Sequence, residues 1–193
     1  MTSGQALPTP APELAAEEPL ATISRRLLAW AVDVVLVTVL VFVGVSIVDA
    51  VLGPAVSFRP EAAALPDTVA VDKGVVAANA LIATGLSSAY FVVPWALWGG
   101  SPAQLALRLR VRADAGSPLP VGRAITRWVL LFPPFATVSA LTAGVALVGW
   151  FIWGSALGWY LVLLLTAARS ETNQGLHDLL AGSVVYKNRA AVG

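Results

Sequence analysis

The residues of this chain that could do chemistry are few, and the most conspicuous are charged side chains in or beside long apolar segments. Asp33 lies inside an apolar run that starts just after Arg26. A carboxylate near the middle of a bilayer costs on the order of 2.5–3.5 kcal/mol, so it must face protein or water. Arg26 and Asp33 share one helix face. Two roles stay open for Asp33: a structural acid, ion-paired or protonated and hydrogen-bonded, and a carrier of protons or ions.

His177 and Asp178 form a second polar pair, but no catalytic motif accompanies them. The chain has no cysteine, a single histidine and no G-x-S-x-G sequence, which argues against thiol chemistry, a metal centre and a serine nucleophile. The Gly99-Gly100 pair is not followed by the Lys-Ser/Thr that a phosphate-binding loop needs. We therefore expect a protein that is not an enzyme and that carries neither metal nor cofactor.

The composition is that of a membrane protein. Hydrophobic residues make up 58% of the 193 residues and charged residues 12%, whereas about a quarter of the residues of a soluble domain are charged. The net charge is only +1, and no basic cluster is interleaved with aromatic residues, so nothing suggests nucleic acid. The expected partners are the lipid bilayer and other membrane helices, including those of a homo-oligomer.

Four segments are apolar enough and long enough to cross a bilayer, which takes about 20 residues. They are residues 27–52, 74–98, 128–146 and 150–168. The last two come from one uncharged run that is about two bilayers long as a helix, so we divide it around 144–154. The expected fold is an all-α membrane protein with four transmembrane helices in a domain of residues 23–186. The Pro-rich residues 1–22 predict a disordered cytoplasmic tail, and residues 187–193 a short C-terminal tail.

The arginines set the expected orientation. Residues 99–127 hold five of them, among which Arg108, Arg110 and Arg127 are secondary candidates for the polar site, whereas residues 53–73 contain only two basic side chains. Because positively charged loops stay inside, we expect both termini on the cytoplasmic side of a bacterial plasma membrane.

A small two-stranded β element is expected on the cytoplasmic face. Leucine and valine alternate with alanine and arginine over residues 104–112, which predicts a strand with one apolar face; an in-plane amphipathic helix is the alternative. Residues 183–186 are also β-prone, and two strand edges satisfy each other by pairing. This pairing would draw Asp178 toward Arg26, with Asp33 one layer deeper and bound to the same arginine or to Arg127. Alternatively, Asp178 only caps or solubilises the tail.

Three sequence blocks in this order resemble the RDD family of small bacterial membrane proteins: RRLLAWAVD, GSPAQLALRLRVRADAGSPLPVGRAITR and QGLHDLLAGSVV. The resemblance extends over about residues 23–186. That family is named for an arginine and an aspartate of its first helix and an aspartate near its C-terminus, which match Arg26, Asp33 and Asp178. The family's middle block carries Gly-Lys where this chain has Ala103-Gln104, so a role of that lysine does not carry over.

The resemblance implies a part in transport. Some family members resemble sodium/proton antiporters, and some actinobacterial ones resemble accessory proteins of Mce-type lipid importers; the Ala, Val and Gly content suits an actinobacterium. Our leading hypothesis is a non-enzymatic accessory or structural subunit of a membrane transport system, because a single buried acid is a thin basis for an ion path. The alternative is a small secondary transporter or cation/proton antiporter that uses Asp33.

Overall fold

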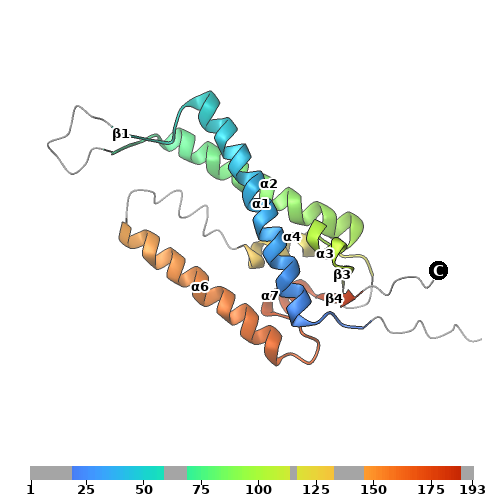
Figure 1. Cartoon of the computed structure of the whole chain (residues 1–193). Helices are drawn as coiled ribbons and strands as arrows, with labels where there is room; N and C mark the ends of the chain where they lie inside the picture. The colour runs from blue at the N-terminus through green and yellow to red at the C-terminus, as the bar shows by residue number, and fades with distance from the viewer. Residues whose placement is uncertain (1–18, 59–68, 114–116, 133–145, 188–193) are drawn as a thin grey trace, which may run out of the picture.

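The protein is described by a computed structural model that covers residues 19–58, 69–113, 117–132 and 146–187. It is mostly helical, with two small antiparallel strand pairs (Figure 1). The helices are α1 (Ile23–Leu52), α2 (Lys73–Trp98), α3 (Pro102–Ala106), α4 (Val121–Leu131), α6 (Ala146–Arg169) and α7 (Leu176–Ala181), and the strands are β1 (Val56–Phe58), β2 (Val69–Val71), β3 (Leu109–Ala113) and β4 (Ser183–Lys187).

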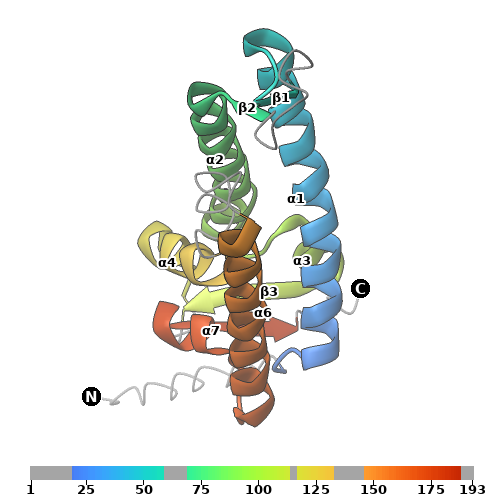
Figure 2. The same ribbon diagram turned by 90° about the vertical axis from the view of Figure 1, so that its left-hand side faces the viewer.

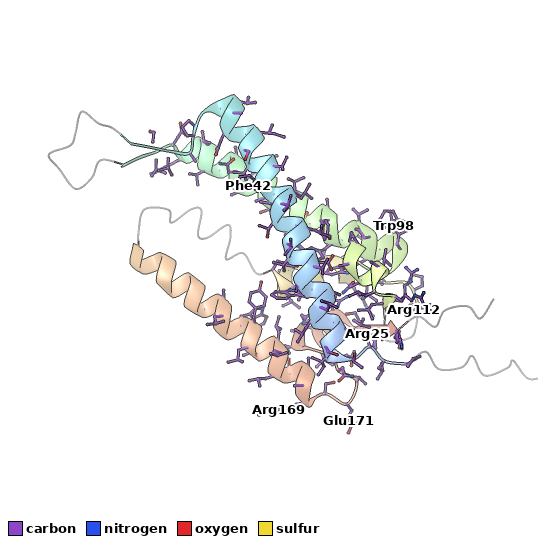
Figure 3. The ribbon with its side chains drawn as sticks, viewed as in Figure 1. Arg25, Phe42, Trp98, Arg112, Arg169 and Glu171 are labelled. Atoms are coloured by element: carbon purple, nitrogen blue, oxygen red, sulfur yellow. The ribbon has the colours of Figure 1, made fainter. Side chains whose placement is uncertain are left out.

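Helices α1 and α2 correspond to the predicted spans 27–52 and 74–98. Both are long and apolar enough to cross a membrane, and only 11% of the most apolar stretch of α1 is buried within the protein. Large side chains such as Val35, Phe42 and Ile47 are exposed, and Phe42 is labelled on α1 in Figure 3. A helix with so much apolar exposed surface needs a lipid or protein environment.

The ends of α2 follow from its local sequence. The Asp72 side chain accepts hydrogen bonds from the backbone N–H groups of Gly74, at 2.8 Å, and Val75, at 3.2 Å, which caps the first turn. Gly99 ends the helix in the left-handed conformation, with φ of 69°. Pro94 lies within the last turn and does not end the helix.

The second half of the chain differs from the prediction. Helix α4 starts before residue 128 and stops at Leu131, because Phe132 leaves the helical conformation ahead of Pro133. The predicted span 128–146 is therefore not one continuous helix, and most of it lies outside the described residues. Helix α6 includes the fourth predicted span, 150–168, but it already runs through most of 144–154, where we had placed a turn. That turn was wrong at 146–154, since glycines are common within apolar membrane helices.

The predicted cytoplasmic β element is present in part. β3 and β4 pair antiparallel with Val111 opposite Val185, which confirms the pairing with residues 183–186. Residues 104–106 belong to α3 instead of a strand, because Ser101 and Gln104 form a capping box that starts a helix there. The second pair, β1 and β2, was not predicted; it lies within the loop 53–73.

A short N-terminal segment pairs with the free edge of β4. The N–H of Ala21 donates to the carbonyl of Val185 at 3.0 Å, and the N–H of Lys187 donates to the carbonyl of Pro19 at 2.8 Å. The predicted disordered tail 1–22 is therefore wrong for residues 19–22, and residues 1–18 lie outside the described part of the chain. β4 is hydrogen-bonded on both sides and holds the start of α1 in place.

The two strand pairs lie at opposite ends of the α1–α2 hairpin (Figure 2). The end with β3, β4 and α7 contains much of the buried core, including Trp95, Leu109, Val111, Leu119 and Val185. Arg25, Arg112, Arg169 and Glu171 gather at this same end (Figure 3). These four charged residues therefore lie at the same end of the molecule as much of the buried core.

Candidate functional site

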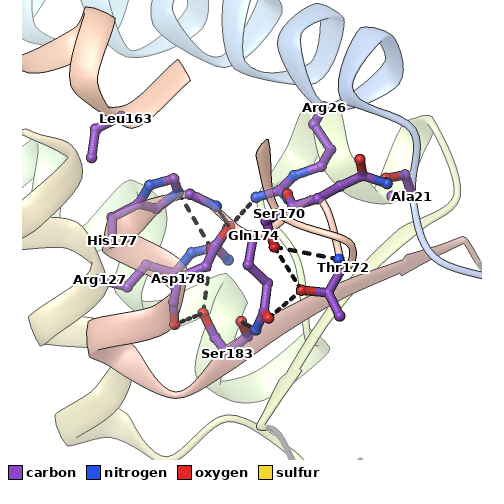
Figure 4. A network of polar contacts seen from close by, with 12 residues as sticks. Ala21, Arg26, Arg127, Leu163, Ser170, Thr172, Gln174, His177, Asp178 and Ser183 are labelled. Carbon is purple, nitrogen blue, oxygen red and sulfur yellow. Dashed lines mark hydrogen bonds and ion pairs between the residues drawn. The ribbon is translucent and has the colours of Figure 1, made fainter. Parts of the chain in front are cut away.

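Asp178 lies at the centre of a buried polar cluster where α1, α4 and α7 meet (Figure 4). Its side chain is fully buried. One carboxylate oxygen, Oδ2, accepts from Nη2 of Arg26, and the other, Oδ1, accepts from Nη2 of Arg127 at 2.8 Å. The contact predicted between Arg26 and Asp178 is present, and Arg127 joins it from a third helix.

The loop before α7 positions Asp178. Asp178 is the third residue of this short helix, and its Oδ2 also accepts from the N–H of Gly175 at 3.3 Å. A Cβ on Gly175 would lie 2.8 Å from the His177 ring and 3.1 Å from the carbonyl of Leu163, so only glycine fits there. Asn173, in the left-handed conformation with φ of 55°, turns its carbonyl to accept from Nη1 of Arg26.

Arg127 is almost wholly buried, at 2% exposure. Its guanidinium carbon lies 4.7 Å from the centroid of the Trp95 ring, so a cation–π contact adds to the ion pair with Asp178. Its Nε and Nη1 have no hydrogen-bond partner among the described residues. Arg127 therefore holds α4 against α2 and α7, while two of its buried nitrogens make no hydrogen bond to the described residues.

The two arginines determine the ionisation of the cluster. Burial alone would raise the pKa of Asp178, but Arg127 and Arg26 hold that pKa well below its usual range. His177 lies with Nε2 at 3.3 Å from Oδ1 of Asp178. Burial, assisted by the two arginines, lowers the pKa of His177 to about 4, so His177 is neutral at pH 7. With two guanidinium groups and one carboxylate, these residues carry one net positive charge.

Asp33 lies in a separate cluster and is 1% exposed. It accepts from the hydroxyl of Tyr90 at 2.8 Å, from the hydroxyl of Ser101 and from the N–H of Ala103 at 3.1 Å. The expected pairing with Arg26 or Arg127 is wrong, because Asp178 binds both arginines. One N–H at the start of α3, that of Ala103, and the two hydroxyl groups supply the donors in their place.

A chain of contacts links the two clusters. Gln104 Oε1 accepts from the N–H of Ser101 at 3.0 Å and from Nε1 of Trp95 at 2.9 Å. Ser101 binds Asp33, and the Trp95 ring lies against Arg127. The three name-giving residues of the predicted motif are thus connected through α2 and α3 and do not form one ion-pair group.

The other candidate arginines lie outside both clusters. Arg110 donates to the carbonyl of Trp98, and Arg108 occupies a positive φ of 57° where the chain turns from α3 into β3. Sequence reasoning missed Tyr90 and Ser101 as partners of Asp33. The Ser-x-x-Gln capping box at Ser101 was a usable signal, whereas nothing distinguished Tyr90.

An apolar cavity of about 330 Å³ adjoins the Asp178 cluster, between α1, α4 and α6. Arg26, Arg127 and His177 line its polar end, and Trp30, Tyr160 and Leu164 contribute to its apolar wall. Trp30 and Tyr160 are in aromatic contact, with ring centroids 5.7 Å apart. Asp33 is not among the lining residues.

Within the described ranges, no group of three or more His, Cys, Asp or Glu side chains could hold a metal ion. Comparison with known families gives a match to the RDD family over residues 20–182, which is most of the chain. Neither the curated proteins nor the solved structures contain a significant match.

Proposed function

Because the chain belongs to the RDD family, we propose that it is a non-enzymatic accessory or structural subunit of a membrane transport system, with Mce-type lipid importers as the first candidate. The observation that carries this proposal is the state of Asp33. Three donors bind this buried carboxylate, and it does not line the cavity. An acid with these contacts suits the fixing of helix positions better than the repeated binding and release of an ion.

The exposed apolar surface of α1 and α2 supports a role among other membrane helices. Their side chains are mostly unburied within this chain, so lipid or helices of a partner cover them in the membrane. The buried clusters, in contrast, lock the inner ends of the helices together. Such a protein offers a rigid surface for a partner without chemistry of its own.

The test uses a candidate transport complex, an Mce-type lipid importer, produced in the same cells as this protein. The complex is purified in mild detergent from cells with and without this protein, and its substrate uptake is measured in both. We expect the protein to copurify with the complex and uptake to fall when it is absent. Full uptake without it, together with a protein that purifies alone, would contradict the proposal.

A small secondary transporter or cation/proton antiporter is the second candidate, and it is favoured only by the presence of a buried carboxylate within a membrane helix. Measurements of ion flux in reconstituted vesicles distinguish the transporter from the accessory subunit. A transporter moves protons or sodium by itself and loses this in Asp33→Asn. An accessory subunit gives no flux in either form.

The proposed topology has four spans with both termini in the cytoplasm. The position of Arg25, Arg112 and Arg169 at one end of the molecule supports it. Since the chain has no cysteine, Ser57→Cys, near the β1–β2 end, and Ser117→Cys, near the β3–β4 end, each give a single labelling site. In intact cells, a membrane-impermeant thiol reagent should label only the first variant. Labelling of only the second would invert the topology.

A further inference from the structure

The free nitrogens of Arg127 mark a place where an acceptor is missing. Nη2 binds Asp178, but Nε and Nη1 of Arg127 have no hydrogen-bond partner among the described residues. The Arg127 side chain lines the cavity. A buried donor without a partner costs about 1–3 kcal/mol, and more when it is charged. This end of the cavity therefore favours a ligand with several acceptor oxygens.

The charge at this end of the cavity specifies an anion. Arg26 and Arg127 face one carboxylate, that of Asp178, and both arginines line the cavity wall. An excess positive charge at a buried site is costly without a counter-ion. Guanidinium groups bind phosphate oxygens strongly, through charge-assisted hydrogen bonds.

The rest of the cavity is suited to hydrocarbon. Leu27 on α1 and Leu157, Leu161 and Leu164 on α6 line it and are themselves 39–74% exposed. The cavity therefore opens on a surface that the bilayer covers, at the charged end of the molecule. Water does not stably fill an apolar space of this kind, whereas an acyl chain matches it.

We propose that this cavity binds one phospholipid of the inner leaflet, with its phosphate against Arg26 and Arg127 and one acyl chain between α1 and α6. Phosphate alone would bind only the arginines at the polar end, and a hydrocarbon chain alone would contact only the leucines. A phospholipid provides both. The lipid site does not depend on the proposed accessory role, because the purified chain should bind the lipid without any partner.

The experiment measures lipids retained by the purified full chain in mild detergent, by native mass spectrometry after exchange against phosphatidylglycerol or against diacylglycerol with the same chains. We expect about one phosphatidylglycerol per chain and much weaker retention of diacylglycerol. Leu164→Trp, which fills the cavity, should weaken retention about tenfold, the equivalent of about 1.4 kcal/mol. Leu165→Trp is the matched control: it is similarly exposed, at 43%, and does not line the cavity.

Arg127→Lys tests the polar end, because lysine keeps the charge for Asp178 but lacks the planar set of donors. Retention of phosphatidylglycerol should fall about tenfold. Equal retention of diacylglycerol, equal loss in the two tryptophan variants, or displacement of the lipid by millimolar inorganic phosphate would overturn the proposal. If Arg127→Lys does not fold, the tryptophan pair still decides. If the protein proves not to bind the lipid, the uptake experiment with the transport complex still tests the accessory role separately.

Discussion

At the scale of single residues, Asp178 is the side chain on which most others depend. Arg127 is buried more completely than Arg26, whose side chain is 13% exposed. Removal of the carboxylate would leave two positive charges side by side, one of them without access to water. The loss of Arg26 alone would leave the pair of Arg127 and Asp178 intact.

We therefore expect Asp178→Ala to be the most destabilising single substitution in the Asp178 cluster. Breaking a buried pair by removing one partner costs about 3–5 kcal/mol, and Arg26→Ala should cost less than Asp178→Ala. The double variant should lose less than the sum of both, because they share one interaction. The measurement is the fraction of folded protein that survives mild heating in detergent. Strict additivity would show that Asp178 only caps or solubilises the tail.

The low pKa of His177 makes stability depend on pH. The pKa is about 4 in the folded protein and about 6.5 in an unfolded chain, so the unfolded chain binds more protons between these values. The stability that neutral His177 contributes is present above pH 6.5 and is lost as the pH falls toward 4. At pH 5 the loss is about 2 kcal/mol, at about 1.4 kcal/mol per pH unit.

Thermal unfolding in detergent at pH 7 and pH 5 measures this effect. The wild-type midpoint should fall by several degrees, whereas the midpoint of His177→Gln, which has no proton to bind in this range, should change less. The carboxylate of Asp178 does not account for such a fall, because its depressed pKa keeps it ionised at both values. An identical shift in the variant would contradict the role of His177.

The sequence predicted the Arg26–Asp178 contact but not the partners of Asp33. Charge and spacing suggest which ions could meet, and the pairing of two β-prone segments brought Asp178 to α1. Hydroxyl donors carry no comparable signal. Tyr90 could equally have been a residue of the membrane interface, so its contact with Asp33 required the packing of α1 against α2.

At the scale of elements, α1 and α2 approach closely at Gly44. A Cβ there would lie 2.5 Å from Cδ1 of Leu86 and 3.0 Å from Cγ2 of Ile82. Gly44→Leu should force the two helices apart at a cost of about 1–3 kcal/mol. The matched control is Gly85→Leu on α2, where a Cβ meets nothing within 4 Å in the described structure.

The comparison is made by thermal unfolding of both variants in the same detergent. Gly44→Leu should unfold at a lower temperature than the wild type, and Gly85→Leu should remain near it. Equal effects of the two substitutions would mean that the spacing of α1 and α2 is not set by Gly44.

The length of the apolar segments predicted these two long helices well, but the alternation of residue types was a poorer guide to the shorter elements. The alternation over 104–112 is real, yet the capping residues at Ser101 and Gln104 assign its first part to α3. Most residues of α4 were assigned to the loop 99–127, which was identified by its arginines. Its buried face consists of Ala124, Arg127 and Leu131, and the buried arginine made the apolar face hard to recognise.

At the scale of the whole molecule, the segment before α1 joins the two ends of the chain by pairing with the edge of β4. Ala21→Pro removes the N–H that donates to Val185 and should cost about 1–3 kcal/mol. Thr22→Pro is the control, since Thr22 has φ of −66°, which suits proline. Limited proteolysis at the C-terminus should be faster in Ala21→Pro than in the control. Equal rates would show that this edge contributes little.

Length and composition predicted the membrane class and the first two spans, because both depend on properties summed over many residues. The division of 128–168 depended on a few glycines and prolines, and the glycines were misleading. The third predicted span is interrupted at Phe132, and most of it lies outside the described residues.

The distance along the chain between Arg26 and Asp178 has a consequence for biosynthesis. α1 leaves the ribosome long before α7 and β4 exist, so Arg26 and the edge at Ala21 must wait for the last part of the chain. Until then, the N-terminal end of α1 has neither its carboxylate nor its strand partner. A chain that ends before α7 therefore leaves this charged helix end without its partners.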